Sequence, residues 1–371
     1  MRLIMLSIAI ILFCEYSFAE ENFIFPNSCA KGKSIIIAAV GDVLLHPPLQ
    51  KQGAEKGFKS LWADAIPYIK SADIAYANLE GPMAQGINEA GHVANSNSVY
   101  TGFPLFNYPP SVGVALKESG FALVSNANNH ALDRLGIGVD RTITSLDKMN
   151  LLHVGTRTRD SQQKMFHIVL AKDFKIAWIA CTAHTNGIAD IHHQILYCYN
   201  KNDRQWIIDK IHELRHQVDA VIVTPHWGEE YQTQPTSAQI NFAHAVLDAG
   251  AIAVLGSHPH VLQPLKKYIT PDGRTTLIMY SLGNFVSYQG RPQTRATVIL
   301  LLGLTKTSQG TNINGIRFVP MYMQNRNGRN IFLQRLNKNE QHTLPQQIIS
   351  NAVPLNNMLY TEQIVTNPEC F

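Results

Sequence analysis

The chain alternates short, continuous apolar runs with amphipathic segments, and this alternation constrains its fold more than any other feature. Residues 34–40 (SIIIAAV) form an apolar run of strand length, as expected of a strand covered on both faces. The amphipathic segments carry helix signals: Thr236 and Gln239 form a capping box, and Gly250 stands where a helix ends. This alternation predicts an α/β fold with largely parallel strand pairing. Further strands are expected at residues 74–78, 122–125, 175–181, 220–224, 251–255 and 276–280.

The later part of the chain has a different pattern. Residues 296–304 and 316–322 are apolar with no clear helix between them, so we expect them to add antiparallel strands to a second sheet. After about Asn337 the sequence is polar and rich in Gln and Asn. Because no repeat or low-complexity linker interrupts the pattern, we expect one domain over residues 31–337 and a peripheral tail over residues 338–371.

The N-terminus has the form of a secretory signal. Arg2 is followed by an apolar stretch over residues 3–13 and by a small-x-small site that ends at Ala19. The alternative is an uncleaved anchor, but the stretch falls short of the roughly 20 residues that span a bilayer. We therefore expect residues 1–19 to be removed, leaving no transmembrane anchor. The mature chain would be exported, to the periplasm, the cell envelope or the medium.

Removal of this leader leaves an even number of cysteines, which is compatible with two disulfides in an exported chain. Four cysteines allow three pairings. We favour Cys181–Cys198 and Cys29–Cys370, the second of which would tie the ends of the mature chain together. Free buried thiols remain the alternative, because no tight spacing dictates the pairing.

Composition narrows the class of ligand. Hydrophobic residues make up 45% and charged residues 16% of the chain, as in a globular protein with a sizeable core. The net charge is only +4 and there is no basic run, which disfavours nucleic-acid binding. A mild positive field suits an anionic small molecule or polymer as partner. The sequence does not indicate an oligomeric state.

Side chains of the kinds that bind metals follow nearly every expected strand. The loops beyond the carboxyl ends of strands are where open α/β sheets bind ligands. One carboxylate after a strand is more often a helix cap, and one histidine is more often structural. A set of carboxylates, an amide and histidines that all follow strands is hard to explain in that way. The residues concerned are Asp42, Glu80, Asn129, His130, His226, His258 and His260.

The composition of this set indicates the kind of metal. His258 and His260 form an HxH pair, which in an extended segment would point both imidazoles to the same side. Mixed imidazole and carboxylate ligation suits Zn, Mn or Fe, whereas Ca or Mg would favour oxygen ligands alone. We therefore expect divalent transition metals as cofactors.

The ordered motifs GD, NLE, NNH, HWG, HPH and SLGNF resemble those of the CapA-like (poly-gamma-glutamate capsule synthesis) family, within the calcineurin-like metallophosphoesterases. The resemblance covers roughly residues 34–290. It implies a four-layer αββα sandwich of the metallophosphoesterase type with mixed sheets, holding two metals at the sheet edge. It further implies that Asp42 and His260 bind the first metal and that Glu80 bridges both. Asn129, His226 and His258 would bind the second metal, and His130 would be an outer acid or transition-state stabiliser.

The chain also departs from the superfamily pattern. The opening motif is D-x-H, yet Leu44 stands at that histidine position, and His46 lies two residues further on. Glu80 replaces the usual bridging Asp. The acid that commonly follows the asparagine–histidine pair is Ala131 here, with Asp133 available a little later.

Several residues outside the candidate ligand set are interpreted as structural or solvent-exposed. His184 is interpreted as structural or exposed, with a place in the pocket wall as the alternative. Trp227 is expected in the core or a pocket wall. Arg291 and Arg295 are expected to be solvated rather than to meet an anionic substrate.

Two functions remain open at this point. One is a two-metal hydrolase that acts on a phosphoester or a related bond in the cell envelope. The other is an accessory protein of capsule polymer synthesis, retention or export, which binds an anionic polymer without turnover. Fold alone does not choose between them, because function resides in the site.

Overall fold

The structure is a computed structural model that describes residues 23–361 except positions 24, 27, 162–164, 327, 329 and 341. The expected signal peptide, residues 1–19, lies outside the described residues. No helix in the described part of the chain is long and apolar enough to cross a membrane.

The strands are β1 (Lys33–Val43), β2 (Ile74–Leu79), β3 (Leu123–Ser125), β4 (Leu152–Val154), β5 (Phe166–Ala171), β6 (Phe174–Thr182), β7 (Ala220–His226), β8 (Ala253–Leu255), β9 (Leu262–Ile269), β10 (Thr275–Leu282), β11 (Asn284–Val286), β12 (Ala296–Thr307), β13 (Gly310–Arg326) and β14 (Asn330–Arg335). The α-helices are α1 (Pro47–Lys56), α2 (Ile66–Ser71), α3 (Ser111–Glu118), α4 (Leu135–Lys148), α5 (Lys201–Leu214), α6 (Ser237–Ala249), α7 (Pro292–Arg295) and α8 (Leu344–Ser350).

The strands form two mixed sheets. The first sheet has the order β14-β13-β12-β1-β2-β3-β4, with β11 paired to β1, and the second has the order β5-β6-β7-β8-β10-β9. Strands β1 to β4 run parallel, as do β6, β7, β8 and β10. The expected strands are therefore present. Helices connect the parallel strands β1 to β4 and β6 to β8, whereas the antiparallel strand β9 connects β8 to β10.

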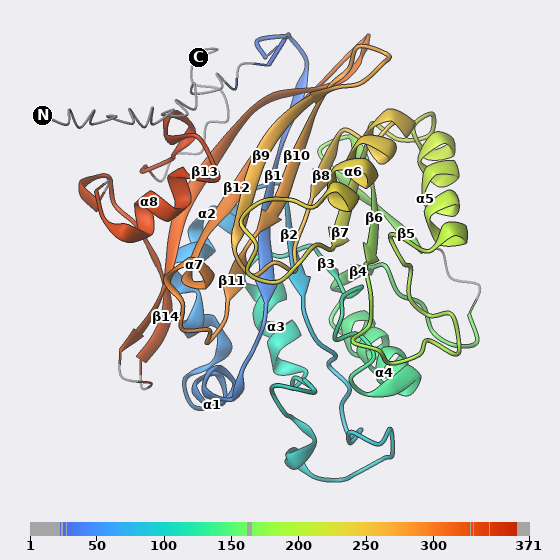
Figure 1. Ribbon diagram of the computed structural model, residues 1–371, viewed down its shortest axis with the longest axis vertical. Coiled ribbons are helices and arrows are strands. Elements are labelled where there is room, and N and C mark those ends of the chain that lie inside the picture. The colour runs from blue at the N-terminus through green and yellow to red at the C-terminus, as the bar shows by residue number, and fades with distance from the viewer. Residues whose placement is uncertain are drawn as a thin grey trace, which may run out of the picture.

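Helices cover the outer face of each sheet, so the fold has four layers. One apolar core lies between the sheets, where Tyr76 of β2 stacks on Trp178 of β6 at a ring-centroid distance of 5.1 Å. A second core joins the first sheet to α1, α2 and α3, and a third joins the second sheet to α5 and α6. Figure 1 shows α5 and α6 along the outer side of the second sheet. The expected four-layer αββα sandwich is confirmed.

The late antiparallel strands lie in a different place from the one expected. β12 pairs antiparallel with β1, and β13 and β14 continue from it. They therefore extend the sheet of β1 instead of adding to the second sheet. The apolar pattern predicted the strands correctly, but it carries no information about which edge they join.

The expectation of a peripheral C-terminal tail is wrong for the described part, up to residue 361. Ile349 of α8 is 0% exposed, and Val353 is 2% exposed, within the core between the sheets. The backbone of Leu359 donates a hydrogen bond to the Phe318 carbonyl of β13. A few apolar residues at helical spacing are enough to dock a segment whose average composition is polar.

The favoured Cys181–Cys198 disulfide is present in the described part of the chain. Cys181, near the end of β6, is joined to Cys198, which precedes α5, with a Cα–Cα distance of 5.2 Å. The bond closes the loop between these elements. The other favoured pairing, Cys29–Cys370, includes a residue outside the described part of the chain.

Candidate metal centre

The metal-type side chains meet at one end of the sandwich. Asp42 is the next-to-last residue of β1, Glu80 directly follows β2, and His226 ends β7. His258 and His260 lie in the short loop between β8 and β9. Because parallel strands bring their carboxyl ends to the same edge, residues from both sheets converge there.

These side chains form two groups that share one carboxylate. The first ligand group consists of Asp42, Glu80 and His260, and the second consists of Glu80, His226 and His258. Within each group the ligand atoms all lie within 4.8 Å of one another, and every member is buried. The arrangement matches the expected division, with Glu80 in the position of a bridge. The amide oxygen of Asn129 lies 2.9 Å from Nε2 of His226, so it adjoins the second ligand group.

Glu80 is in an environment that a cation would satisfy. Its side chain is 0% exposed, and neither carboxylate oxygen has a hydrogen-bond partner among the described residues. Burial, together with the charge of Asp42, raises the pKa of Glu80 well above its usual value. A buried carboxylate without a hydrogen-bond partner is costly, even with the imidazoles of His226 and His260 at 3.6 and 3.8 Å. The site therefore fits a positive ion placed between Glu80 and its neighbours.

The imidazoles of the second ligand group are suited to be ligands. Burial, reinforced by neighbouring histidines, lowers the pKa of both His226 and His258 well below the usual value. The neutral imidazole is the form that binds a metal. Burial alone would also lower the pKa of His260, but Glu80 and Asp42 outweigh it and raise that pKa to about 9. In the absence of an ion, His260 thus acts as the counter-charge to the two carboxylates.

Two asparagines hold the ligands in place, and sequence reasoning gave them no role. Asn78 donates to Oδ1 of Asp42 at 2.8 Å and lies 3.1 Å from Nδ1 of His226, so it joins ligands from both sheets. Asn284 of β11 lies 3.0 Å from Nδ1 of His260. Both belong to the quoted motifs NLE and SLGNF. The available signal was an amide within an apolar strand, a position that burial permits only with hydrogen-bond partners.

The backbone of the HPH segment differs from the expected extended form. His258 has a φ of 99° and His260 a φ of 60°, values that side-chain-bearing residues adopt at a cost of about 1–3 kcal/mol. The two imidazoles therefore belong to different ligand groups instead of sharing one side of a strand. Such strain concentrates at functional sites.

The GD motif has a steric explanation. A Cβ on Gly41 would lie 1.8 Å from the carbonyl oxygen of Gly283, which accepts a hydrogen bond from the Asp42 backbone at 3.0 Å. Only glycine allows β1 to approach the loop before β11 so closely. This approach holds Asp42 next to Asn284, the first residue of β11.

His130 lies beside the ligand groups and is held by a carboxylate. Its Nδ1 is 2.7 Å from Oδ2 of Asp133, which also accepts from the Phe106 backbone at 2.6 Å. The Phe106 ring packs edge-on against the imidazole at 4.7 Å. The carboxylate that contacts His130 therefore comes from Asp133, two positions after Ala131. The contact leaves Nε2 of His130 without a hydrogen-bond partner in the described part of the chain.

Comparison with known proteins identifies the family. Residues 36–289 match the family described as bacterial capsule synthesis protein PGA_cap. The chain belongs to this family. It is 30% identical over 282 residues to PGA biosynthesis protein CapA of Bacillus subtilis (strain 168), covering 73% of this chain and 68% of the relative. It is 27% identical over 320 residues to capsule biosynthesis protein CapA of Bacillus anthracis, covering 85% and 74%.

Among solved structures, the crystal structure of calcineurin-like phosphoesterase YfkN from Bacillus subtilis aligns with 86% of this chain and 98% of that chain. The sequence identity is 15% and the TM-score 0.45.

In this capsule-synthesis family member, the histidine of the D-x-H pattern has no counterpart in the ligand groups. Leu44 is 2% exposed and packs in the core on the helical side of the first sheet. His46 lies outside both groups, and its Nδ1 lies 3.3 Å from the Tyr288 amide, which donates to it. Burial lowers the pKa of His46 to about 4. The first ligand group therefore has one imidazole where the usual motif would supply more.

The remaining residues are placed as follows. His184 lines a cavity beside the second ligand group, and its ring centroid lies 5.2 Å from that of His258. The structure therefore supports the alternative interpretation of His184, a place in the pocket wall. Trp227 is a core residue, 0% exposed. Arg295 packs on Tyr322 and donates to the Met323 carbonyl, a structural role. Arg291 is exposed and stacks on Tyr231 at 4.8 Å.

Proposed function

We propose that this chain is an exported hydrolase of the capsule-synthesis family that acts, with two divalent transition metals, on a phosphoester or a related bond in the cell envelope. The observation that carries the proposal is Glu80, a fully buried carboxylate with no hydrogen-bond partner among the described residues and a member of both ligand groups. A bridging carboxylate offsets the repulsion between two adjacent cations.

The donor set supports transition metals. Asp42 and His260 would hold one ion, His226 and His258 the other, and Glu80 both; Zn, Mn and Fe accept such mixed ligands. When bound, such ions polarise the scissile bond and lower the pKa of the attacking water. Asn129 would add a neutral oxygen, which limits the negative charge around the second ion.

His130 supplies the proton chemistry in this proposal. Asp133 and the Phe106 ring fix its orientation, and its Nε2 remains available. An imidazole held in this way can protonate the leaving oxygen of a substrate bound at the ligand groups. The anionic part of the substrate would be drawn to the ions themselves.

Two features support export. The leader over residues 1–19 has the pattern of a cleaved signal. The Cys181–Cys198 disulfide is of the kind that persists in oxidising compartments.

The second candidate is an accessory role in polymer synthesis, retention or export, in which the site binds an anionic polymer such as poly-gamma-glutamate without turnover. The names of the relatives favour it, since both refer to biosynthesis of a capsule or of PGA. The two candidates differ in whether the bound metal drives hydrolysis.

Metal analysis and a phosphoester panel test the proposal. Purified mature protein should retain close to two equivalents of Zn, Mn or Fe, and chelation should abolish hydrolysis of phosphomonoesters or phosphodiesters until metal is returned. Asp42→Ala and His258→Ala should lose metal and activity together. His212→Ala, an exposed histidine of α5, is the matched control and should lose neither. Metal-loaded wild type that is inert on the whole panel would favour the accessory role.

A further inference from the structure

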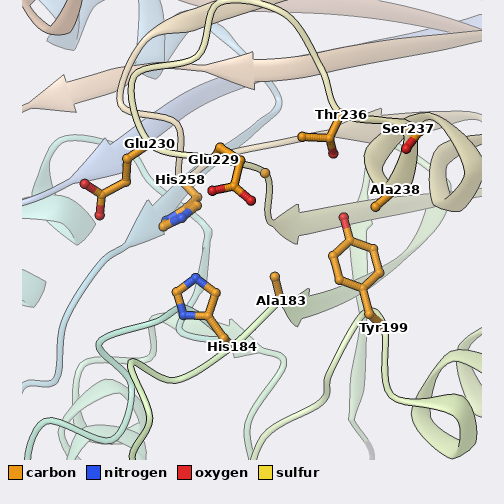
Figure 2. A pocket seen from close by; sticks show the side chains of 10 residues that line it. Ala183, His184, Tyr199, Glu229, Glu230, Thr236, Ser237, Ala238 and His258 are labelled. Carbon is orange, nitrogen blue, oxygen red and sulfur yellow. The ribbon is translucent and has the colours of Figure 1, made fainter.

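A large cavity adjoins the second ligand group. Its volume is about 670 Å³. Its walls come from the loop after β6, the segment before α5, the loop after β7, the start of α6 and the loop after β8. Figure 2 shows the side chains of the wall around a common space. The polar residues that matter here are His184, Tyr199, Glu229, Glu230, Thr236 and His258.

His258 connects this cavity to the candidate metal centre. It is 3% exposed, belongs to the second ligand group and lines the cavity. Its Nδ1 lies 3.0 Å from Nε2 of His226, whereas its Nε2 has no hydrogen-bond partner in the described part of the chain. A molecule in the cavity therefore lies directly against the metal-binding imidazole.

The charge of the cavity wall is one-sided. Glu229 and Glu230 both line it and are exposed, and within the described residues no lysine or arginine forms an ion pair with either. Among the residues that the structure describes, no lysine or arginine lines the cavity. Tyr199 also lines the cavity and carries no charge that would offset the two glutamates. The wall is thus complementary to a positive group on the ligand.

The positive group is better explained as organic than as a third metal ion. Neither Glu229 nor Glu230 belongs to a group of three ligand side chains close enough to hold a metal within the described residues. The cavity is also far larger than one ion needs, since a water molecule occupies about 30 Å³ in the liquid.

We propose that this cavity binds an ammonium group, so that the site takes a zwitterionic ligand whose anionic end lies at the metal centre. The placement of the anionic end rests on the proposed function, whereas the ammonium preference rests on the cavity alone. A polyanion would be repelled by Glu229 and Glu230 along its length. A polymer could enter only by an end that carries an amino group.

Isosteric ligand pairs test the preference. Phosphocholine and 3,3-dimethylbutyl phosphate have the same shape and differ in the positive charge, as do choline and 3,3-dimethylbutanol. Calorimetric titration of the metal-loaded mature chain should give phosphocholine about fivefold tighter binding than its neutral analogue, as expected of two exposed carboxylates. The phosphate-free pair, measured by ligand-observed NMR after chelation, should show the same order.

Variants of the two glutamates test whether they cause the preference for the charged ligand. Glu229→Gln and Glu230→Gln should each reduce the affinity ratio of the charged ligand to its neutral analogue about twofold. The double variant should bring this ratio close to one. Glu55→Gln, an exposed glutamate on α1, should leave it unchanged. Equal binding of choline and 3,3-dimethylbutanol, or a ratio that survives the double variant, would overturn the proposal. Loss of metal and turnover with the choline preference intact would instead count against the proposed hydrolysis alone.

Discussion

Glu80 shows how a binding site can conflict with stability at the scale of one residue. It is a carboxylate surrounded by apolar strands and imidazoles, with both oxygens buried and no hydrogen-bond partner in the described residues. A protein without a ligand at this position would be more stable with a neutral side chain. This conflict supports the proposal that Glu80 binds a cation.

Glu80→Gln should therefore stabilise the chelated protein. The pKa of Glu80 is raised above 4.5 in the folded state, so the folded state binds this proton more tightly than the unfolded state. The stability of the chelated wild type is then greatest below about pH 4.5 and falls as the pH rises towards the folded pKa. At pH 8 the variant should exceed wild type by about 1–3 kcal/mol in denaturant unfolding, and the difference should shrink at pH 5. A variant less stable than wild type at both pH values would contradict this account.

In the proposed function His130 acts through its Nε2, so its removal should affect the rate and not the metal content. His130→Ala should lower kcat about 10²–10⁴-fold, the usual contribution of a general acid. Asp133→Asn should have a smaller effect, because it loosens the imidazole without removing it. Metal content by mass spectrometry should equal that of wild type in both variants. Loss of bound metal in His130→Ala would show that this residue is a ligand.

At the scale of elements, the segment between β6 and α5 forms part of the cavity beside the metal centre. His184 and Tyr199 lie at its two ends, each close to one cysteine of the disulfide. Asn186, within the segment, accepts a hydrogen bond from Asn129 at 3.3 Å. The disulfide therefore holds a cavity wall as well as a loop.

Replacing both cysteines should measure how much the disulfide contributes to the free energy of unfolding. Cys181 and Cys198 are separated by 17 positions, and a loop of this length corresponds to about 3 kcal/mol in the chain-entropy treatment. The Cys181→Ser/Cys198→Ser variant should lose about that much free energy of unfolding relative to oxidised wild type in urea titrations. Equal stability of the two proteins would mean that the fold holds this segment without the bond.

At the scale of the whole molecule, the candidate metal centre lies between the two sheets and draws residues from both. Asp42 and Glu80 belong to the first sheet, whereas His226, His258 and His260 come from the second. Each ligand group contains residues from both sheets, so an ion bound at either group would cross-link the layers at one end of the sandwich. The C-terminal segment with α8 packs on the same inter-sheet core.

Metal should therefore raise the thermal stability of the whole domain. Free metal at 100 times its dissociation constant adds about 2.7 kcal/mol to the free energy of unfolding. Calorimetry of wild type and His212→Ala should show a higher Tm with metal than after chelation. Asp42→Ala and His258→Ala should show little shift. If metal raised the Tm of His258→Ala as much as that of wild type, the stabilising ion would bind outside the two ligand groups.

The α/β alternation and the clustering of the candidate ligands could be predicted from local patterns, whereas the four-layer order was implied by the family resemblance. Doubly covered strands need continuous apolar runs, and parallel pairing places the residue after each strand at a common edge. Asp42, Glu80 and His226 could be predicted for this reason, without knowledge of any contact.

Other features were decided by the tertiary structure, because they depend on contacts between distant segments. The positive φ of His258 and His260 directs them to different ligand groups, and no local pattern encodes that turn. The pairing of β12 with β1, the docking of α8, and the cavity of Glu229 and Glu230 beside His258 likewise arise from packing. Hydrophobic burial does not depend on sequence distance, so a period of two or 3.6 residues predicts an element but not its neighbour.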